Sequence, residues 1–192
     1  VQMDAGVIVT DGSSSEGIYV VGGAGGGDAA ALMSGGSITV NGNGSRGITV
    51  HSSLDGNATA AISGGTILTT GSDAAGIQTY TLGAGTGVAR VEMSGGAVTT
   101  TGVGIGLRAR SFGFGDAIVL MSGGDLTVAS TGTNTRGLSA ELLNLASTGS
   151  AIAALSDGTV STAGISSHGV YAQNSGLGAA EATMSGGTIT TT

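Results

Sequence analysis

The side chains best suited to binding chemistry recur about every 30 residues, at outward positions of short alternating segments. One set of equivalent positions is Tyr19, Thr49, Gln78, Arg108, Ser139 and Tyr171. A second set, two residues further along each segment, is Val21, His51, Tyr80, Arg110, Glu141 and Gln173. Mixed aromatic and polar walls of this kind bind carbohydrates or proteins. We therefore select a candidate interaction face: Tyr19, His51, Tyr80, Arg108, Arg110, Glu141 and Tyr171.

Catalysis would require more than this face offers. A carbohydrate-active lyase or hydrolase needs paired carboxylates near a base, whereas Glu141 is the one acidic residue in the two sets. It is expected beside Arg110 of the neighbouring repeat, so the alternative to a binding face is a solvated sheet with one cross-strand ion pair. His51 and His168 fall two to four repeats apart and do not form a metal site together. We predict no catalytic residue, no metal site and no cofactor.

A second candidate surface is apolar and lies in loops. Phe112 and Phe114 belong to one loop, and Leu142, Leu143 and Leu145 belong to the equivalent loop of the next repeat. Equivalent loops in adjacent coils of a parallel stack lie about 4.8 Å apart. The five side chains should therefore be neighbours, either as a satellite core that covers the sheet edge or as an exposed contact patch.

A third surface carries outward Thr and Ser, as in Thr99-x-Thr101 and Thr188-x-Thr190. A flat Thr-x-Thr array is typical of ice-binding solenoids. Here Leu68, Ala97 and Asp125 interrupt the array, and Thr is favoured in strands on its own account. Ice binding therefore remains a further alternative to ordinary strand propensity.

All of these positions belong to one internal repeat. The phrase Met-Ser-Gly-Gly-Thr-Ile-Thr at Met184 has full or degenerate copies throughout the chain, anchored at residues 3, 33, 62, 93, 121, 155 and 184. The anchors are separated by 30, 29, 31, 28, 34 and 29 residues. A period near 30 from end to end indicates a repeat protein, and the long unit from 121 to 155 suggests an insertion at a binding edge.

Each repeat contains three short segments of alternating polar and apolar residues. In the unit from 33 to 62 they are 37–40, 47–50 and 58–62, separated by Gly-, Ser- and Asn-rich turns. No segment has helical spacing or caps. The pattern predicts an all-β chain, a right-handed parallel β-helix (a β-solenoid) of about six triangular coils of ~30 residues with three short strands per coil.

Two kinds of position support this fold. Apolar residues should stack inside the coil, such as Ile38 above Ile67 in the first segment and Ile48 above Ile77 in the second. A glycine opens the second segment of every repeat, at residues 17, 47, 76, 106, 137 and 169. We expect these glycines to have positive φ at a corner where a side chain would clash.

The amino-acid composition limits the classes of partner that the chain can bind and bears on its cellular location. The 192 residues include five Arg, no Lys and twelve acids, which give a net charge of −7, and there is no Cys. Such a surface does not neutralise a phosphate backbone, so nucleic acid is a poor partner. No apolar run approaches the ~18 residues that suggest a transmembrane segment, and the absence of Cys suits a chain that crosses a membrane unfolded.

The chain resembles the passenger region of bacterial autotransporter adhesins, the pertactin-like β-helices. The residues that carry the resemblance are the Ser-Gly-Gly-Thr-Ile-Thr phrase and phrases such as Gly17-Ile18-Tyr19-Val20 and Gly169-Val170-Tyr171-Ala172. The resemblance implies export and display at the bacterial cell surface. It transfers no catalytic residues, because no matching motif exists.

These observations predict a structural, surface-displayed or extracellular β-solenoid of adhesin type, which mediates adhesion to a host or cell-surface glycan or protein or forms a filament. Residues 1–192 should form a single solenoid domain. The first and last anchors have the same phase and neither terminus carries a polar capping repeat. We therefore expect the array to continue in the same chain, or copies to associate end to end.

Overall fold

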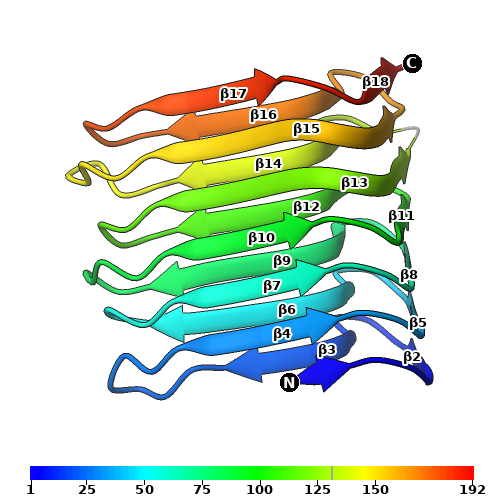
Figure 1. The fold of residues 1–192 in the computed structure, drawn as a ribbon, viewed down its shortest axis with the longest axis horizontal. Helices are drawn as coiled ribbons and strands as arrows, with labels where there is room; N and C mark the ends of the chain where they lie inside the picture. The colour runs from blue at the N-terminus through cyan, green and yellow to red at the C-terminus, as the bar shows by residue number, and fades with distance from the viewer. Residues whose placement is uncertain (131) are drawn as a thin grey trace.

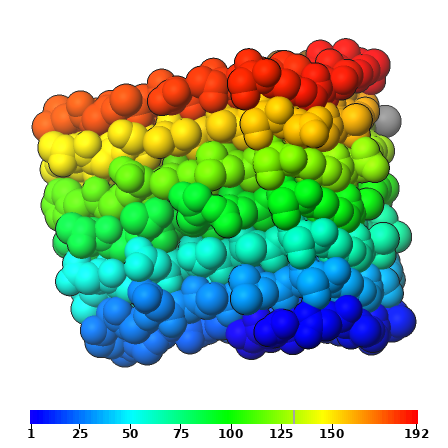
Figure 2. Space-filling model, viewed as in Figure 1, coloured from blue at the N-terminus to red at the C-terminus, as the bar shows by residue number. Residues whose placement is uncertain are grey.

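The computed structural model describes residues 1–130 and 132–192, and it is an all-β parallel solenoid of about six turns (Figure 1). Each strand pairs in parallel with its equivalent about 30 residues away, as Met93 does with Ile62 on one side and Met121 on the other. The coils therefore lie as flat layers that follow the order of the chain (Figure 2). The predicted parallel β-solenoid of about six coils is confirmed.

The strands form three ladders. The first contains β1 (Gln2–Met3), β4 (Ala29–Met33), β7 (Ala58–Ile62), β10 (Ala89–Met93), the beginnings of β13 (Ala117–Ala129) and β15 (Ala151–Thr162), and β17 (Ala180–Met184). The second contains β2 (Val7–Asp11), β5 (Ser37–Asn41), β8 (Thr66–Thr70), β11 (Ala97–Thr101), the ends of β13 and β15, and β18 (Thr188–Thr191). The third contains β3 (Glu16–Val21), β6 (Arg46–Ser53), β9 (Ala74–Leu82), β12 (Gly104–Ser111), β14 (Arg136–Leu142) and β16 (His168–Asn174).

The three ladders make two sheets, whereas three sheets were expected. β13 and β15 each run through the Ser-Gly-Gly or Ser-Asp-Gly corner without a break, and Ser122 pairs with Asp157 there through an irregular register. The first two ladders consequently join into one 12-stranded sheet, and the third ladder is a separate 6-stranded sheet. In the coils that hold β13 and β15, the first two segments are one strand, so these coils have two strands instead of three.

The core lies between the two sheets and follows the predicted columns. Ile38, Ile67, Ile48 and Ile77 are at most 1% exposed. Met33, Met93 and Met121 fill the equivalent corner of their coils and are also buried. Burying such side chains stabilises the fold by about 1.5–3 kcal/mol each, and stacking aliphatic side chains of similar size in successive coils leaves few voids.

The recurring glycine at the second or third position of each strand in the 6-stranded sheet is required because there is no space for a side chain, and not because of its φ. Gly47 and its equivalents lack positive φ, in contrast to the prediction, but a Cβ on Gly47 would lie 2.3 Å from the Ile67 side chain. Positive φ occurs instead at the corner glycine of the Ser-Gly-Gly phrase, with φ of 83° at Gly36 and 85° at Gly65. The glycine column thus lets the core isoleucines approach the backbone closely.

Adjacent residues on β8 test which side chains point inward. Ile67 is 1% exposed and Leu68 is 37% exposed. We expect Ile67→Asp to lower the free energy of unfolding by several kcal/mol, because it buries a carboxylate without a partner. Leu68→Asp should cost about 1 kcal/mol or less, mainly through strand propensity. Denaturant unfolding of the two variants measures the difference, and equal losses would contradict the assigned inward face.

Candidate functional site

The outer face of the 6-stranded sheet brings the sequence-predicted binding residues together. Parallel register places Val21, His51, Tyr80, Arg110, Glu141 and Gln173 in one row across the strands. A second row holds Tyr19, Thr49, Gln78, Arg108, Ser139 and Tyr171. A third row, nearer the beginnings of the strands, contains Glu16, Arg46, Ala75, Ile105, Arg136 and His168.

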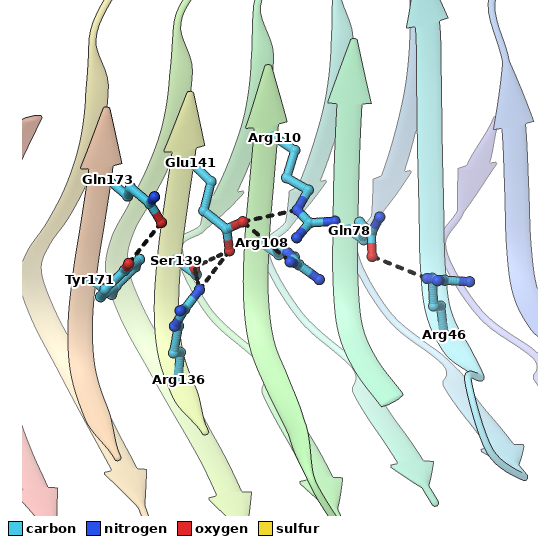
Figure 3. A network of polar contacts seen from close by, with 9 residues as sticks. All are labelled: Arg46, Gln78, Arg108, Arg110, Arg136, Ser139, Glu141, Tyr171 and Gln173. Carbon is cyan, nitrogen blue, oxygen red and sulfur yellow. Dashed lines mark hydrogen bonds and ion pairs between the residues drawn. The ribbon is translucent and has the colours of Figure 1, made fainter. Parts of the chain in front are cut away.

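The centre of this face is Glu141, which is only 3% exposed and is held by three arginines (Figure 3). Its Oε2 accepts from Arg110 Nε at 2.9 Å and from Arg108 Nη2 at 3.2 Å. Its Oε1 accepts from Arg136 Nη1 at 2.8 Å and from Ser139 Oγ at 2.9 Å. The predicted Arg110–Glu141 pair is confirmed, and it belongs to a larger network. Charge-assisted bonds of this kind are stronger than neutral ones.

Neighbouring side chains also fix Arg136 and a fourth arginine, Arg46, which lies outside the Glu141 network. The Arg136 guanidinium carbon lies 3.7 Å from the centre of the Tyr171 ring, a cation–π stack. The Tyr171 hydroxyl in turn donates to Gln173 Oε1 at 2.8 Å. On the other side, Arg46 Nε donates to Gln78 Oε1 at 3.0 Å, and Arg46 Nη1 lies 3.8 Å from Glu16. Four guanidinium groups are therefore held on one face.

Three ring side chains form a second cluster towards the first coils. His51 stacks on Tyr80 with ring centres 4.9 Å apart and planes inclined by 10°. Tyr19 lies on the other side of His51, with its hydroxyl 3.3 Å from His51 Nδ1. Burial raises the pKa of the Tyr80 hydroxyl above its ordinary value, so this group is neutral at physiological pH. The cluster offers stacked ring faces with polar edges.

Two adjoining clefts cross this face. The larger, of about 520 Å³, is the arginine cleft: it is lined by Arg46, Arg108, Arg110 and Arg136, together with small residues at the beginnings of β9 and β12. The smaller, of about 240 Å³, shares Arg46 and Arg110 and adds Tyr80 and Phe112. A third cleft, of about 640 Å³, crosses the 12-stranded sheet and is lined mainly by Ser, Ala and apolar residues without a cation. Convergent charged groups make the arginine cleft the better candidate site.

The apolar loop patch is only partly as predicted. Leu142 is the last residue of β14 and is fully buried in the core, so it does not belong to the loop. Phe112, Phe114 and Leu145 are 40%, 38% and 76% exposed, and Leu143 is half-buried. Adjacent-coil stacking is confirmed at the base of the loop, where the Leu143 amide donates to the Ser111 carbonyl.

Several residues differ from the sequence-based expectation for a solvated face. Thr49, Gln78 and Ser139 are 1%, 7% and 0% exposed, because larger side chains of the same sheet cover them. A Thr49→Asp change, which the outward assignment predicts to be nearly silent, should therefore destabilise the chain.

Arg46 and Arg136 were not selected from the sequence. Each is the first residue of its strand and directly precedes the recurring glycine, and this shared repeat position is the signal that could have identified them.

No protein-family model, no curated protein and no solved structure matches this chain. Within residues 1–130 and 132–192, no three His, Cys, Asp or Glu side chains are grouped so that they could hold a metal ion. The same residues include no helix of the length and apolar character needed to cross a bilayer.

Glu141 should be a stability determinant. Glu141→Gln removes the single carboxylate that three arginines share, and we expect a loss of about 3–5 kcal/mol in the free energy of unfolding, as when one partner of a buried ion pair is removed. Glu92→Gln is the matched control, because the Arg90–Glu92 pair lies on β10 with side chains 35% and 42% exposed. Such an exposed pair contributes about 0–1 kcal/mol.

Chemical denaturation of both variants, followed by far-UV circular dichroism, provides the comparison. If Glu141→Gln were as stable as the parent chain, the three arginines would not depend on this carboxylate.

Proposed function

We propose that the chain is a structural β-solenoid of bacterial adhesin type, displayed at the cell surface or outside the cell, which binds a glycan through the outer face of its 6-stranded sheet. The observation that carries the proposal is the segregation of side chains. This one sheet holds all three Tyr, both His and four of the five Arg of the chain. The Ser-Gly-Gly phrases quoted above support an adhesin-type passenger, and the parallel solenoid is consistent with it.

The chemistry of the face suits a sugar ligand. The Tyr80 ring is held by its stack on His51 and lines the smaller cleft with Phe112, where it offers apolar surface to a sugar ring. The arginines and the Tyr hydroxyls supply hydrogen-bonding groups around it. The clefts are held by stacked strands, so a ligand would meet a preformed site and lose less free energy to ordering it.

Self-association is the structural part of the proposal. Within residues 1–130 and 132–192, β1, β2 and β3 pair only with the following coil, and β16, β17 and β18 pair only with the preceding one. Every residue of β17 is exposed, including Met184 at 50%. Open strand edges pair readily with further strands. Either additional coils or a second copy would therefore extend the solenoid into a filament.

A carbohydrate-active enzyme is less well supported by the same face. The two carboxylates in its three outward rows, Glu16 and Glu141, lie four coils apart, which is roughly 19 Å at the spacing of paired strands. Glycoside hydrolysis uses carboxylates separated by about 5–9.5 Å. Both oxygens of Glu141 are also already engaged.

Binding by this face predicts a specific loss on mutation. The double change His51→Ala and Tyr80→Ala removes the stacked rings, so retention of the chain on a glycan array should fall by at least about tenfold. Leu68→Ala, an exposed apolar truncation on the 12-stranded sheet, is the control and should leave retention unchanged. Equal retention by both variants would contradict binding through the 6-stranded sheet, and release of reducing sugars from the array would favour an enzyme.

A further inference from the structure

Charge on the outer face of the 6-stranded sheet is not balanced. Arg108, Arg110 and Arg136 share the one carboxylate of Glu141, and Arg46 lies 3.8 Å from Glu16. One further acid, the exposed Asp73, lines the arginine cleft. Four of the five cations and three of the twelve acids are therefore here, which leaves one cation and nine acids for the rest of the chain. The cleft is a local positive site on an acidic protein.

The repulsion between these guanidinium groups has a structural origin. Arg108 and Arg110 are two residues apart on β12, so their side chains leave the same face of the sheet, and both reach Glu141 Oε2. Like charges at such short range, partly shielded from water, repel more strongly than on an open surface. Glu141 and Asp73 together balance two of these three positive charges, so the three arginines and two acids keep a net charge of +1. A further anion in the cleft would relieve this repulsion.

The cleft also retains hydrogen-bond donors. Among the described residues Arg110 donates through Nε alone, so its two terminal nitrogens have no acceptor. Arg108 is bonded only through Nη2, and its guanidinium lies on the Gln78 side of β12, towards Arg46 (Figure 3). Side-chain exposures of 18–31% leave the four guanidiniums partly accessible to solvent. Planar guanidinium groups of this kind bind carboxylate or sulfate oxygens in pairs.

The surroundings indicate what carries the anion. The arginine cleft continues past Arg46 and Arg110 into the smaller cleft, where Tyr80 and Phe112 supply aromatic walls. An anionic group beside aromatic walls matches an acidic sugar, whose charged substituent projects from a ring with apolar faces. The net charge of −7 disfavours a long polyanion that would contact the rest of the surface. A short acidic segment fits better.

We propose that the arginine cleft binds the carboxylate or sulfate group of an acidic sugar, with Arg46 and Arg110 at the junction between the anionic group and the sugar ring. This inference rests on the proposed glycan-binding function and specifies its ligand class. Arg108 and Arg136 complete the positive field, and Glu141 positions both of them.

Three oligosaccharides of equal length distinguish the sources of the anion: one sulfated, one containing uronic acids and one neutral. Calorimetric titration of the chain should give affinities for one or both acidic probes at least about tenfold above that for the neutral probe. Arg46→Gln and Arg110→Gln should each reduce the acidic affinity about tenfold. Arg90→Gln is the matched control, because it removes the same charge from β10 on the other sheet, and its effect should be below about twofold.

Melting temperatures measured with and without inorganic sulfate check folding and the site together. Sulfate should raise the melting temperature of the parent chain and of Arg90→Gln more than that of Arg110→Gln. Equal affinity for acidic and neutral probes, or an equal loss in Arg90→Gln, would overturn the inference. If the neutral probe binds as well as the acidic ones and Tyr80→Ala abolishes binding, glycan binding stands and the acidic specificity fails. If none of the three binds, both proposals fail.

Discussion

In-register stacking of coils is the constraint on which the rest of this structure depends. Every strand that pairs on both sides does so with its own equivalents, so each side chain lies between the corresponding side chains of the coils above and below. The backbone bonds fix the spacing at about 4.8 Å, and a slip of one residue would turn the isoleucine column outward. One consequence is that glycine is required where a Cβ would clash with the isoleucine of the next coil, as at Gly17 and Gly47.

The same constraint explains the polar face. Residues about 30 apart in the chain become neighbours, so Arg110 and Glu141 meet although 31 residues separate them. In the core, a column of like residues stabilises the folded state, because Ile packs on Ile. On the surface, a column of like charges destabilises it, because charges of one sign would lie next to each other. The chain gathers three of its five arginines around one carboxylate and places its Tyr and His on the same sheet. Such a concentration of like charges costs stability, which is commonly seen at functional sites, and is the reason we propose binding through this face.

Much of this arrangement follows from the sequence, and the exceptions have physical causes. A repeated sequence shows which residues are equivalent in successive coils, and therefore which strands pair and in which register. This equivalence predicts the period, the inward columns and the Arg110–Glu141 pair. The two sheets were missed because joining at the corner of β13 depends on backbone bonds that no residue type specifies. Leu142 was read as a loop residue because β14 extends through it into the core. The burial of Thr49 and Ser139 was missed for a different reason. The alternation of polar and apolar residues distinguishes inward-facing from outward-facing side chains, but it does not show which outward-facing side chains are covered by larger neighbours.

Register across all six coils can be measured directly. The chain lacks cysteine, so Val21→Cys and Gln173→Cys would give two unique spin-label sites in one row of the 6-stranded sheet. Five strand-to-strand steps separate them, and pulsed electron paramagnetic resonance should give a narrow distance distribution centred near roughly 24 Å. A broad distribution, or one centred beyond about 35 Å, would contradict the stacked register that brings Glu141 and its arginines together.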